Sequence, residues 1–276
     1  TYGMGTPFEK TALHGISLTI ENGEFLGVIG HTGSGKSTFV QHLNGLIHPT
    51  TGTVTVNGVD ISASTEEAKK MRHKVGMVFQ YPEHQLFEET IAEDIAFGPK
   101  NLGLSSDEVD ERVRDAMKFV GLDYNTYAER SPFHLSGGQM RRVAIAGVVA
   151  MNPDFLVLDE PSAGLDPFGR EEIFEEIIRL HKEKGITVIL VSHNMEDISR
   201  MASRLVVLDK GRIVLDGEPM DIFNNHRDAL QAVGVDVPPV SVTMEYLREQ
   251  GLDVSNQVLS VDDAVQAILE GGSHVK

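Results

Sequence analysis

The sequence predicts an α/β fold with a largely parallel central sheet. Short apolar runs bounded by glycine and polar residues recur along the chain, and longer helical patterns separate them. Runs that are apolar throughout are typical of strands buried on both faces, as in parallel sheets. Strands that alternate with helices favour an α/β domain. The predicted strands are residues 24–29, 53–56, 75–79, 155–158 and 187–191.

Helices are predicted between these strands. Their ranges are residues 36–46, 106–120, 139–150 and 170–184. The second helix starts with a capping box, in which Ser105 is followed three residues later by Glu108, and Gly121 ends it. Gly185 stops the fourth helix directly before the last predicted strand.

A β-hairpin is predicted near the end of the main domain. Apolar segments 205–208 and 212–215 flank Asp209, Lys210 and Gly211, a combination typical of a tight turn between two strands. The main domain is therefore predicted to end near residue 220.

The chain after residue 220 is predicted to form a small accessory domain. The two domains are thus residues 1–220 and 221–276. Two short amphipathic helices are expected in the second, at 242–249 and 261–269, and Ser260 with Asp263 marks the start of the latter. The sequence leaves two roles open for this domain, which are stabilisation of the core and dimerisation.

Composition limits the classes of function. The 276 residues are 41% hydrophobic and 24% charged, which is ordinary for a folded protein. A formal net charge of −17 argues against broad nucleic-acid binding, and the lack of cysteine excludes disulfides and thiolate metal sites. No apolar run approaches the roughly 20 residues needed to cross a bilayer, so any membrane role is expected through partners. Because Thr1 falls in what looks like mid-domain, we expect an upstream stretch.

A glycine-rich loop between the first strand and the first helix matches the phosphate-binding pattern G-x-x-x-x-G-K-[ST]. Its residues are Gly30, His31, Thr32, Gly33, Ser34, Gly35, Lys36 and Ser37, with Thr38 next in the helix. Glycines let the backbone curl so that N–H groups point at phosphate oxygens, and the helix N-terminus adds its dipole. We expect Lys36 to reach the β- and γ-phosphates of ATP and the Ser37 hydroxyl to bind Mg²⁺.

Polar residues follow three of the predicted strands. Asp159 and Glu160 end the strand at 155–158, His193 follows the strand at 187–191, and Gln80 follows the strand at 75–79. Ligands of parallel sheets collect at the carboxyl ends of strands, so these side chains are expected beside the phosphates. Asp159 is predicted to hold Mg²⁺ through water, and Glu160 to polarise the attacking water as general base. His193 would hydrogen-bond the γ-phosphate, and Gln80 would sense Mg²⁺ and the water.

A second anion cradle is predicted where Leu135 is followed by Ser136, Gly137, Gly138 and Gln139, because a serine and two glycines open a helix there. With the phosphate loop, Gln80, Asp159-Glu160, a D-loop at 162–166 and His193 in this order, the chain resembles the ABC transporter ATPases.

The resemblance implies a P-loop NTPase of the ABC-ATPase fold, with a RecA-like core, an antiparallel β subdomain, a helical subdomain at about 83–150 and the small C-terminal domain. It also implies a dimer in which Ser136–Gln139 clamps ATP held on the opposite subunit's phosphate loop. In the family an aromatic residue upstream of that loop stacks on adenine, and Tyr2 occupies this position.

Further stretches resemble the second ATPase, the A′ subunit, of energy-coupling factor (ECF) transporters. They are residues 80–90 (QYPEHQLFEET), 95–103 (IAFGPKNLG), 135–142 (LSGGQMRR) and 161–167 (PSAGLDP), where Gly164 is inserted relative to many ABC proteins. This resemblance implies pairing with a homologous A-subunit ATPase, docking on a membrane T-subunit that contacts a substrate-binding S-subunit, a peripheral position on the cytoplasmic face of the cell membrane, and uptake of vitamins or transition-metal ions.

The stretch from residue 83 to residue 94 is rich in acids. They are Glu83, Glu88, Glu89, Glu93 and Asp94. One hypothesis is that they receive basic coupling helices of the T-subunit, and the alternative is a solvated acidic face.

Three other functions stay open at this point. The first is a homodimeric ATPase of a dedicated cobalt or nickel importer. The second is a non-transport ABC protein of DNA repair or translation, although the chain has one cassette, no long coiled coil and a strong negative charge. The third is a nucleotide-binding regulator that does not hydrolyse ATP, against which Glu160 and His193 argue.

Overall fold

The computed structural model describes residues 1–272 and divides the chain into two compact units. Unit 1 joins Thr1–Phe39 to the part of the chain from Leu190 onward, and unit 2 is Val40–Ile189. The chain passes from unit 1 to unit 2 within helix α1 (Lys36–Leu43) and returns within strand β6 (Thr187–Val191). This division separates the parts of the chain that pack most closely within themselves. It does not test the domain boundary predicted near residue 220, which stays a prediction.

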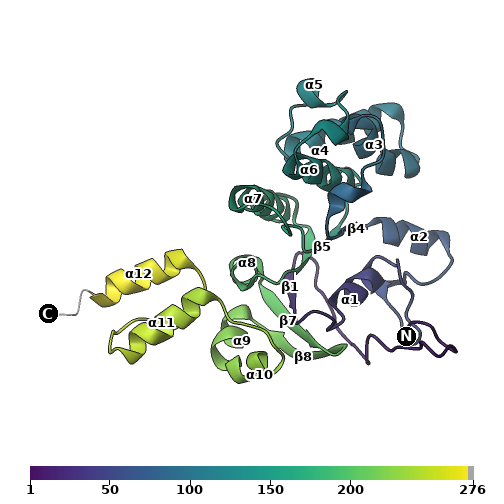
Figure 1. Ribbon diagram of the computed structural model, residues 1–276. Helices are drawn as coiled ribbons and strands as arrows, with labels where there is room; N and C mark the ends of the chain where they lie inside the picture. The colour runs from purple at the N-terminus through teal and green to yellow at the C-terminus, as the bar shows by residue number, and fades with distance from the viewer. Residues whose placement is uncertain (273–276) are drawn as a thin grey trace. The chain divides into compact units, whose positions relative to one another are not determined.

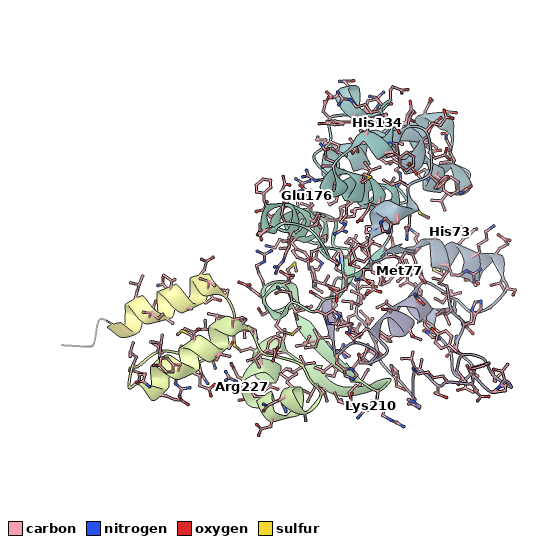
Figure 2. All side chains as sticks on the ribbon, in the orientation of Figure 1. His73, Met77, His134, Glu176, Lys210 and Arg227 are labelled. Atoms are coloured by element: carbon pink, nitrogen blue, oxygen red, sulfur yellow. The ribbon has the colours of Figure 1, made fainter. Side chains whose placement is uncertain are left out.

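Unit 1 contains a buried parallel strand pair that a hairpin extends. Strand β1 (Phe25–Ile29) is buried along its whole length and runs parallel to β7 (Arg204–Asp209), with Leu26 opposite Arg204. Strand β8 (Arg212–Gly217) returns antiparallel to β7. The turn between them uses positive φ at Lys210 (44°) and Gly211 (73°), and Figure 2 labels Lys210 there. The predicted hairpin is confirmed.

The remaining helices of unit 1 lie in the C-terminal half of the chain. They are α8 (Met195–Met201), α9 (Pro219–Asn225), α10 (Arg227–Ala232), α11 (Pro239–Glu249) and α12 (Val261–Gly272). Helices α11 and α12 lie side by side at the yellow end of Figure 1 and share a small core around Met244, Val254 and Val258. An ion pair between Arg227, which Figure 2 labels, and Glu245 joins α10 to α11.

Unit 2 combines strands with a helical cluster. Strand β4 (Val75–Val78) runs parallel to β5 (Phe155–Asp159), and both are almost fully buried. Strands β2 (Thr55–Val56) and β3 (Val59–Asp60) form a separate antiparallel pair. Helices of the unit are α2 (Glu66–His73), α3 (Ile91–Asn101), α4 (Ser106–Phe119), α5 (Tyr124–Tyr127), α6 (Gly137–Val149) and α7 (Pro167–Lys184). Two 3₁₀ turns, Pro82–Gln85 and Pro132–His134, precede α3 and α6.

Helices α3, α4 and α6 pack on one another as a cluster in unit 2 (Figure 1). Valine and isoleucine side chains on the inner faces are buried, among them Ile95, Val113 and Val143. The capping box predicted at Ser105 is present, because the Ser105 hydroxyl accepts from the Glu108 N–H and the Glu108 carboxylate accepts from the Ser105 N–H. Gly121 follows the helix at φ 69°, as its role predicts.

Every predicted strand and helix is present, although several bounds differ. Helix α1 ends at Leu43 rather than 46, because Gly45 takes φ 73° in the turn that follows. The strand predicted at 53–56 shortens to β2. Three helices begin two or three residues early, two because Ser136 and Asp166 cap them there and one because Pro239 opens the helix. Helix α12 ends at Gly272 rather than 269. Within residues 1–272, no helix is long and apolar enough to span a membrane.

A candidate nucleotide-binding and hydrolysis site

The phosphate loop of unit 1 connects β1 to α1 and is closely packed at its start. Gly30 has a φ of 151°, and a Cβ built on it would lie 2.2 Å from the Leu208 carbonyl oxygen and 2.6 Å from Ser34 Oγ. Only glycine fits there, because the nearest atom belongs to the backbone of the neighbouring strand β7. Gly33, at φ 83°, has no described atom within 4 Å of its built Cβ, so the middle of the loop is open.

Lys36 lies across this loop. Its side chain is largely buried, and Nζ donates to the carbonyl oxygens of Gly30 at 2.6 Å and His31 at 3.1 Å. A further hydrogen bond, from the Ser34 N–H to the His31 carbonyl oxygen at 3.1 Å, closes a turn inside the loop. The ammonium is therefore enclosed by the loop that opens helix α1, where backbone N–H groups and the helix dipole favour an anion.

His31 ties the phosphate loop to the end of β7. Its Nε2 lies 2.9 Å from Asp209 Oδ1, and its Nδ1 lies 2.7 Å from the Thr32 carbonyl oxygen. From the sequence, Asp209 is predicted only as part of the hairpin turn. His31 and Asp209 are 178 residues apart, so no local sequence pattern links Asp209 to the phosphate loop.

Tyr2 lies beside helix α1. Backbone hydrogen bonds of 2.8 and 3.0 Å pair it with Lys10, and its hydroxyl lies 3.1 Å from Thr38 Oγ1. The residue is 45% exposed, which leaves surface for a planar ligand. Stacking of Tyr2 on adenine stays a prediction that this placement supports.

His193 is the remaining predicted site residue of unit 1. It is exposed, and lies two residues beyond the end of β6. Asn194 next to it caps α8, since its side-chain oxygen accepts from the N–H groups of Glu196 and Asp197. The backbone at His193 is thus held between a buried strand and a capped helix.

In unit 2, the predicted acids and Gln80 emerge at one edge of a strand pair. Val78 lies opposite Leu158 in the parallel pair β4–β5, so Gln80 and Glu160 both follow at the carboxyl ends of adjacent strands. Asp159 is 7% exposed, whereas Gln80 is exposed. Glu160 has φ 53°, a left-handed conformation that costs a non-glycine residue about 1–3 kcal/mol and that clusters at functional sites.

The cradle at residues 136–139 is also in unit 2, where Ser136 caps α6. The Ser136 hydroxyl accepts from the Gln139 N–H at 3.3 Å, and the Gln139 amide oxygen accepts from the Ser136 N–H at 3.1 Å. Ser136 and Gly137 are exposed, and no described atom lies within 4 Å of a Cβ built on Gly137. The helix N-terminus therefore faces open space, as a cradle for a ligand from outside the chain would.

The acidic stretch divides into two kinds of side chain. Glu83 forms an ion pair with Arg141, and Asp94 accepts from the N–H groups of Phe87 and Glu88 at 3.2 and 3.3 Å. Burial raises the pKa of Asp94, against the effect of these two hydrogen bonds. Glu83 and Asp94 thus hold the chain in place, and Glu93 accepts from the Thr90 hydroxyl at 2.9 Å, which leaves Glu88 and Glu89 for contact with a partner.

The predicted residues thus fall into two groups. Unit 1 holds Tyr2, the phosphate loop through Thr38, and His193, while unit 2 holds Gln80, the cradle, Asp159 and Glu160. No group of three or more His, Cys, Asp or Glu side chains within residues 1–272 is arranged to hold a metal ion. The predicted Mg²⁺ ligands are a hydroxyl, an amide and a single carboxylate, so that absence does not test them and their role stays a prediction.

Comparison with known proteins adds a family. Residues 13–163 match the family model described as ABC transporter. The "energy-coupling factor transporter ATP-binding protein EcfA2" of Clostridium tetani is 54% identical over 98% of this chain and 93% of its own length. The protein of that name from Caldanaerobacter subterraneus is 50% identical over 97% of this chain and 93% of its own length.

Solved structures agree with this. CbiO1 of Clostridium perfringens, described as part of the ABC transporter complex cbiONQ, matches with a TM-score of 0.71 and 37% identity, over 85% of this chain and 92% of that one. The ATP-binding cassette MJ0796, solved as a dimer in a post-hydrolysis state bound to ADP and Pi, matches with a TM-score of 0.67 and 31% identity, over 75% of this chain and 90% of that one.

Proposed function

Because the chain belongs to the ABC transporter family, as an ATPase of the energy-coupling factor group, we propose that it drives the uptake of vitamins or transition-metal ions through membrane partners. One observation carries this proposal. The same chain holds a phosphate loop packed around Lys36 and, at Ser136, a second helix N-terminus that faces open space. A chain with half of each of two sites is suited to a dimer that binds ATP at its interface.

The chemistry of hydrolysis is assigned to residues at strand ends. The loop residues Gly30–Thr38 bind the phosphates, and Tyr2 stacks on the adenine. Glu160 accepts the proton of the attacking water, and His193 and Gln80 hydrogen-bond the γ-phosphate and that water. Ser37, Gln80 and Asp159 offer hydroxyl, amide and carboxylate oxygens, the donor types that Mg²⁺ prefers, so they fit this ion. Bound Mg²⁺ would neutralise charge on the phosphates.

The proposed dimer pairs this chain with a homologous A-subunit ATPase. The alternative is a homodimer serving a dedicated importer, to which the likeness to CbiO1 gives weight. The EcfA2 relatives are 50–54% identical against 37% for CbiO1, which favours the heterodimer. A non-transport function, or a regulator without hydrolysis, has no observation in its favour.

The C-terminal helices provide a surface for such a dimer. Val261, Val265 and Leu269 recur at every fourth position of α12 and are 51–66% exposed, while Ala264 and Ile268 of the same helix face the small core. Val242 and Tyr246 form a similar exposed pair on α11. Helix α12 is thus apolar on two sides, one packed on the small core and the other exposed within residues 1–272, and this supports the dimerisation role for residues 221–276.

Substitution Val265→Glu is expected to weaken the dimer by at least tenfold, because it places a charge in the centre of an apolar contact. Native mass spectrometry, with and without a homologous ATPase, measures the dimer and shows whether the partner is a second copy. Val214→Glu is the matched control, since Val214 is 43% exposed on β8 and outside the helix pair. Equal dimer fractions for the two variants would exclude this surface.

The second proposed surface, for the T-subunit, lies in unit 2. Phe87 and Phe97 are 58% and 46% exposed and pack edge to face, with ring centroids 4.9 Å apart. Glu88, Glu89 and Glu93, called the acidic rim below, lie between these two phenylalanines in the sequence. An aromatic centre with an acidic rim suits an amphipathic helix that carries basic residues. The chain would then sit peripherally on the cytoplasmic face, where the T-subunit also contacts the S-subunit.

Reversal of two rim charges, Glu88→Lys with Glu89→Lys, is expected to prevent assembly with the T-subunit, because like charges then face each other. Co-purification of the complex and substrate uptake into vesicles measure the effect. The control is Asp110→Lys with Glu111→Lys, which makes the same change of charge on the exposed side of α4. Intact assembly and uptake in the first variant would show that the acids are only a solvated face.

A further inference from the structure

Arg141 lies on α6, two residues beyond the cradle, and is among the most completely buried side chains in the described part of the chain. It is 2% exposed. Its Nε donates to Glu83 Oε2 at 3.0 Å and its Nη2 to Glu83 Oε1 at 2.8 Å, which makes a two-pronged ion pair. Its Nη1 donates to the carbonyl oxygens of Ala163 at 2.6 Å and Pro161 at 3.2 Å. One guanidinium thus joins three segments of unit 2.

The segments that Arg141 joins all carry predicted function. Glu83 belongs to the turn that follows Gln80, and Arg141 belongs to the helix that Ser136 caps. Pro161 and Ala163 belong to the turn after Glu160, which is closed by a bond of 3.1 Å from the Ala163 N–H to the Glu160 carbonyl oxygen. The side chain of Tyr81 also lies near the Arg141 guanidinium.

The Tyr81 ring lies beside both the arginine and the D-loop. The Arg141 guanidinium carbon lies 6.0 Å from the centre of the ring, and a Cβ built on Gly164 would lie 3.7 Å from a carbon of the same ring. Gly164 itself is at φ 78°. The inserted glycine of the D-loop therefore takes a left-handed conformation next to the segment that follows Gln80.

We propose that Arg141 is a positioning residue for ATP hydrolysis. It fixes the turn after Glu160 and therefore the direction of the Glu160 carboxylate. Because Arg141 also holds Glu83, this direction depends on the position of the Tyr81–Gln85 segment. The inference rests on the proposed role of Glu160 as general base. It adds a physical link from the surface assigned to the T-subunit, which begins at Phe87, to the residue that activates water.

Arginine is suited to this position in a way that lysine is not. The guanidinium presents five donors in a fixed plane, so two can hold a carboxylate while others reach carbonyl oxygens on another side. Burial by itself raises the pKa of Glu83, but hydrogen bonds from Arg141 and the charge of its guanidinium outweigh burial, so the pKa lies below its ordinary value. The ion pair is therefore present at neutral pH and is lost only as the pH falls below the ordinary carboxyl range.

The test compares Arg141→Lys with Arg142→Lys in the assembled complex. Arg142 is adjacent on α6 and forms its own ion pair with Glu172 at 2.5 Å, so the control keeps the chemistry of the change and leaves the D-loop contacts intact. Arg141→Lys is expected to lower kcat about tenfold and to change the KM for ATP less than twofold, because the hydrogen bonds of the guanidinium go to Glu83, Pro161 and Ala163 rather than to the phosphate loop or the cradle. Arg142→Lys is expected to leave both within twofold.

Two double variants test the proposed connection. Adding Glu83→Gln to Arg141→Lys is expected to lower kcat by much less than Glu83→Gln does alone, because the pair is already broken. In the Glu160→Gln background, measured by single turnover, Arg141→Lys is expected to have little further effect. If Glu160→Gln abolishes turnover and Arg141→Lys behaves like Arg142→Lys, the positioning role fails while the base assignment stands.

The variants could also affect folding. Folding of each variant is checked by its melting temperature and by ATP binding of the chain. If Arg141→Lys does not fold, Glu83→Gln alone replaces it, because that change preserves the shape of the buried pair. A kcat lowered several-fold at constant KM supports the proposal, and an unchanged kcat overturns it.

Discussion

Replacement of Glu160 by Gln is expected to leave ATP binding intact and to lower turnover of the assembled complex by about 10²–10⁴-fold, the range that a general base contributes. Glutamine has nearly the same size and can occupy the same space after β5. It cannot accept a proton from water. This variant is therefore expected to keep ATP binding, measured by equilibrium titration, and to lose hydrolysis, measured by phosphate release.

The structure gives a second reason to expect a large effect at Glu160. The residue is held at φ 53°, a left-handed conformation of the kind that clusters at functional sites. Glu175→Gln is the control, because Glu175 is an exposed carboxylate on α7. Undiminished hydrolysis by the Glu160 variant would show that another residue is the base, and loss of ATP binding would show a structural defect.

The sequence predicted strands better than helices, for a physical reason. Strands β1, β5 and β6 are buried throughout, so their unbroken apolar runs stand out from their surroundings. Helix α3 was missed although Thr90 and Glu93 form a capping signal at its start, because Gly98 and Pro99 near its end resemble a loop. Pro99 is buried, and tertiary packing in the helical cluster overrides its low helical propensity.

The candidate site was predictable where chemistry is local. The phosphate loop, the cradle at Ser136 and the acids after β5 are contiguous patterns whose function follows from backbone conformation and strand ends. Asp209 and Arg141 were missed because their partners, His31 and Glu83, are 178 and 58 residues away in the sequence. A buried arginine implies an acidic partner, but only the fold shows which of the acids it is.

The exposed end of α6 leads to the last prediction, Gly137→Ala. In the chain by itself the substitution is expected to be tolerated, because Gly137 has no positive φ and its built Cβ meets no described atom within 4 Å. Alanine also favours helix, so stability is expected to stay the same or to rise by up to about 1 kcal/mol. ATP binding by the isolated chain is expected to be unchanged.

Hydrolysis in the dimer is nevertheless expected to fall by about 10²-fold at the ATP that the partner holds, because the added methyl group stands where the phosphate must approach the helix N-terminus. Gly147→Ala provides the control on the same helix, since its Cβ would make only ordinary contacts of 3.8 Å or more. A variant that is stable and binds ATP but fails only in the dimer places the defect in the shared site. Full activity would mean that this helix end clamps no nucleotide, and a loss already present in the isolated chain would mean that Gly137 acts within its own subunit.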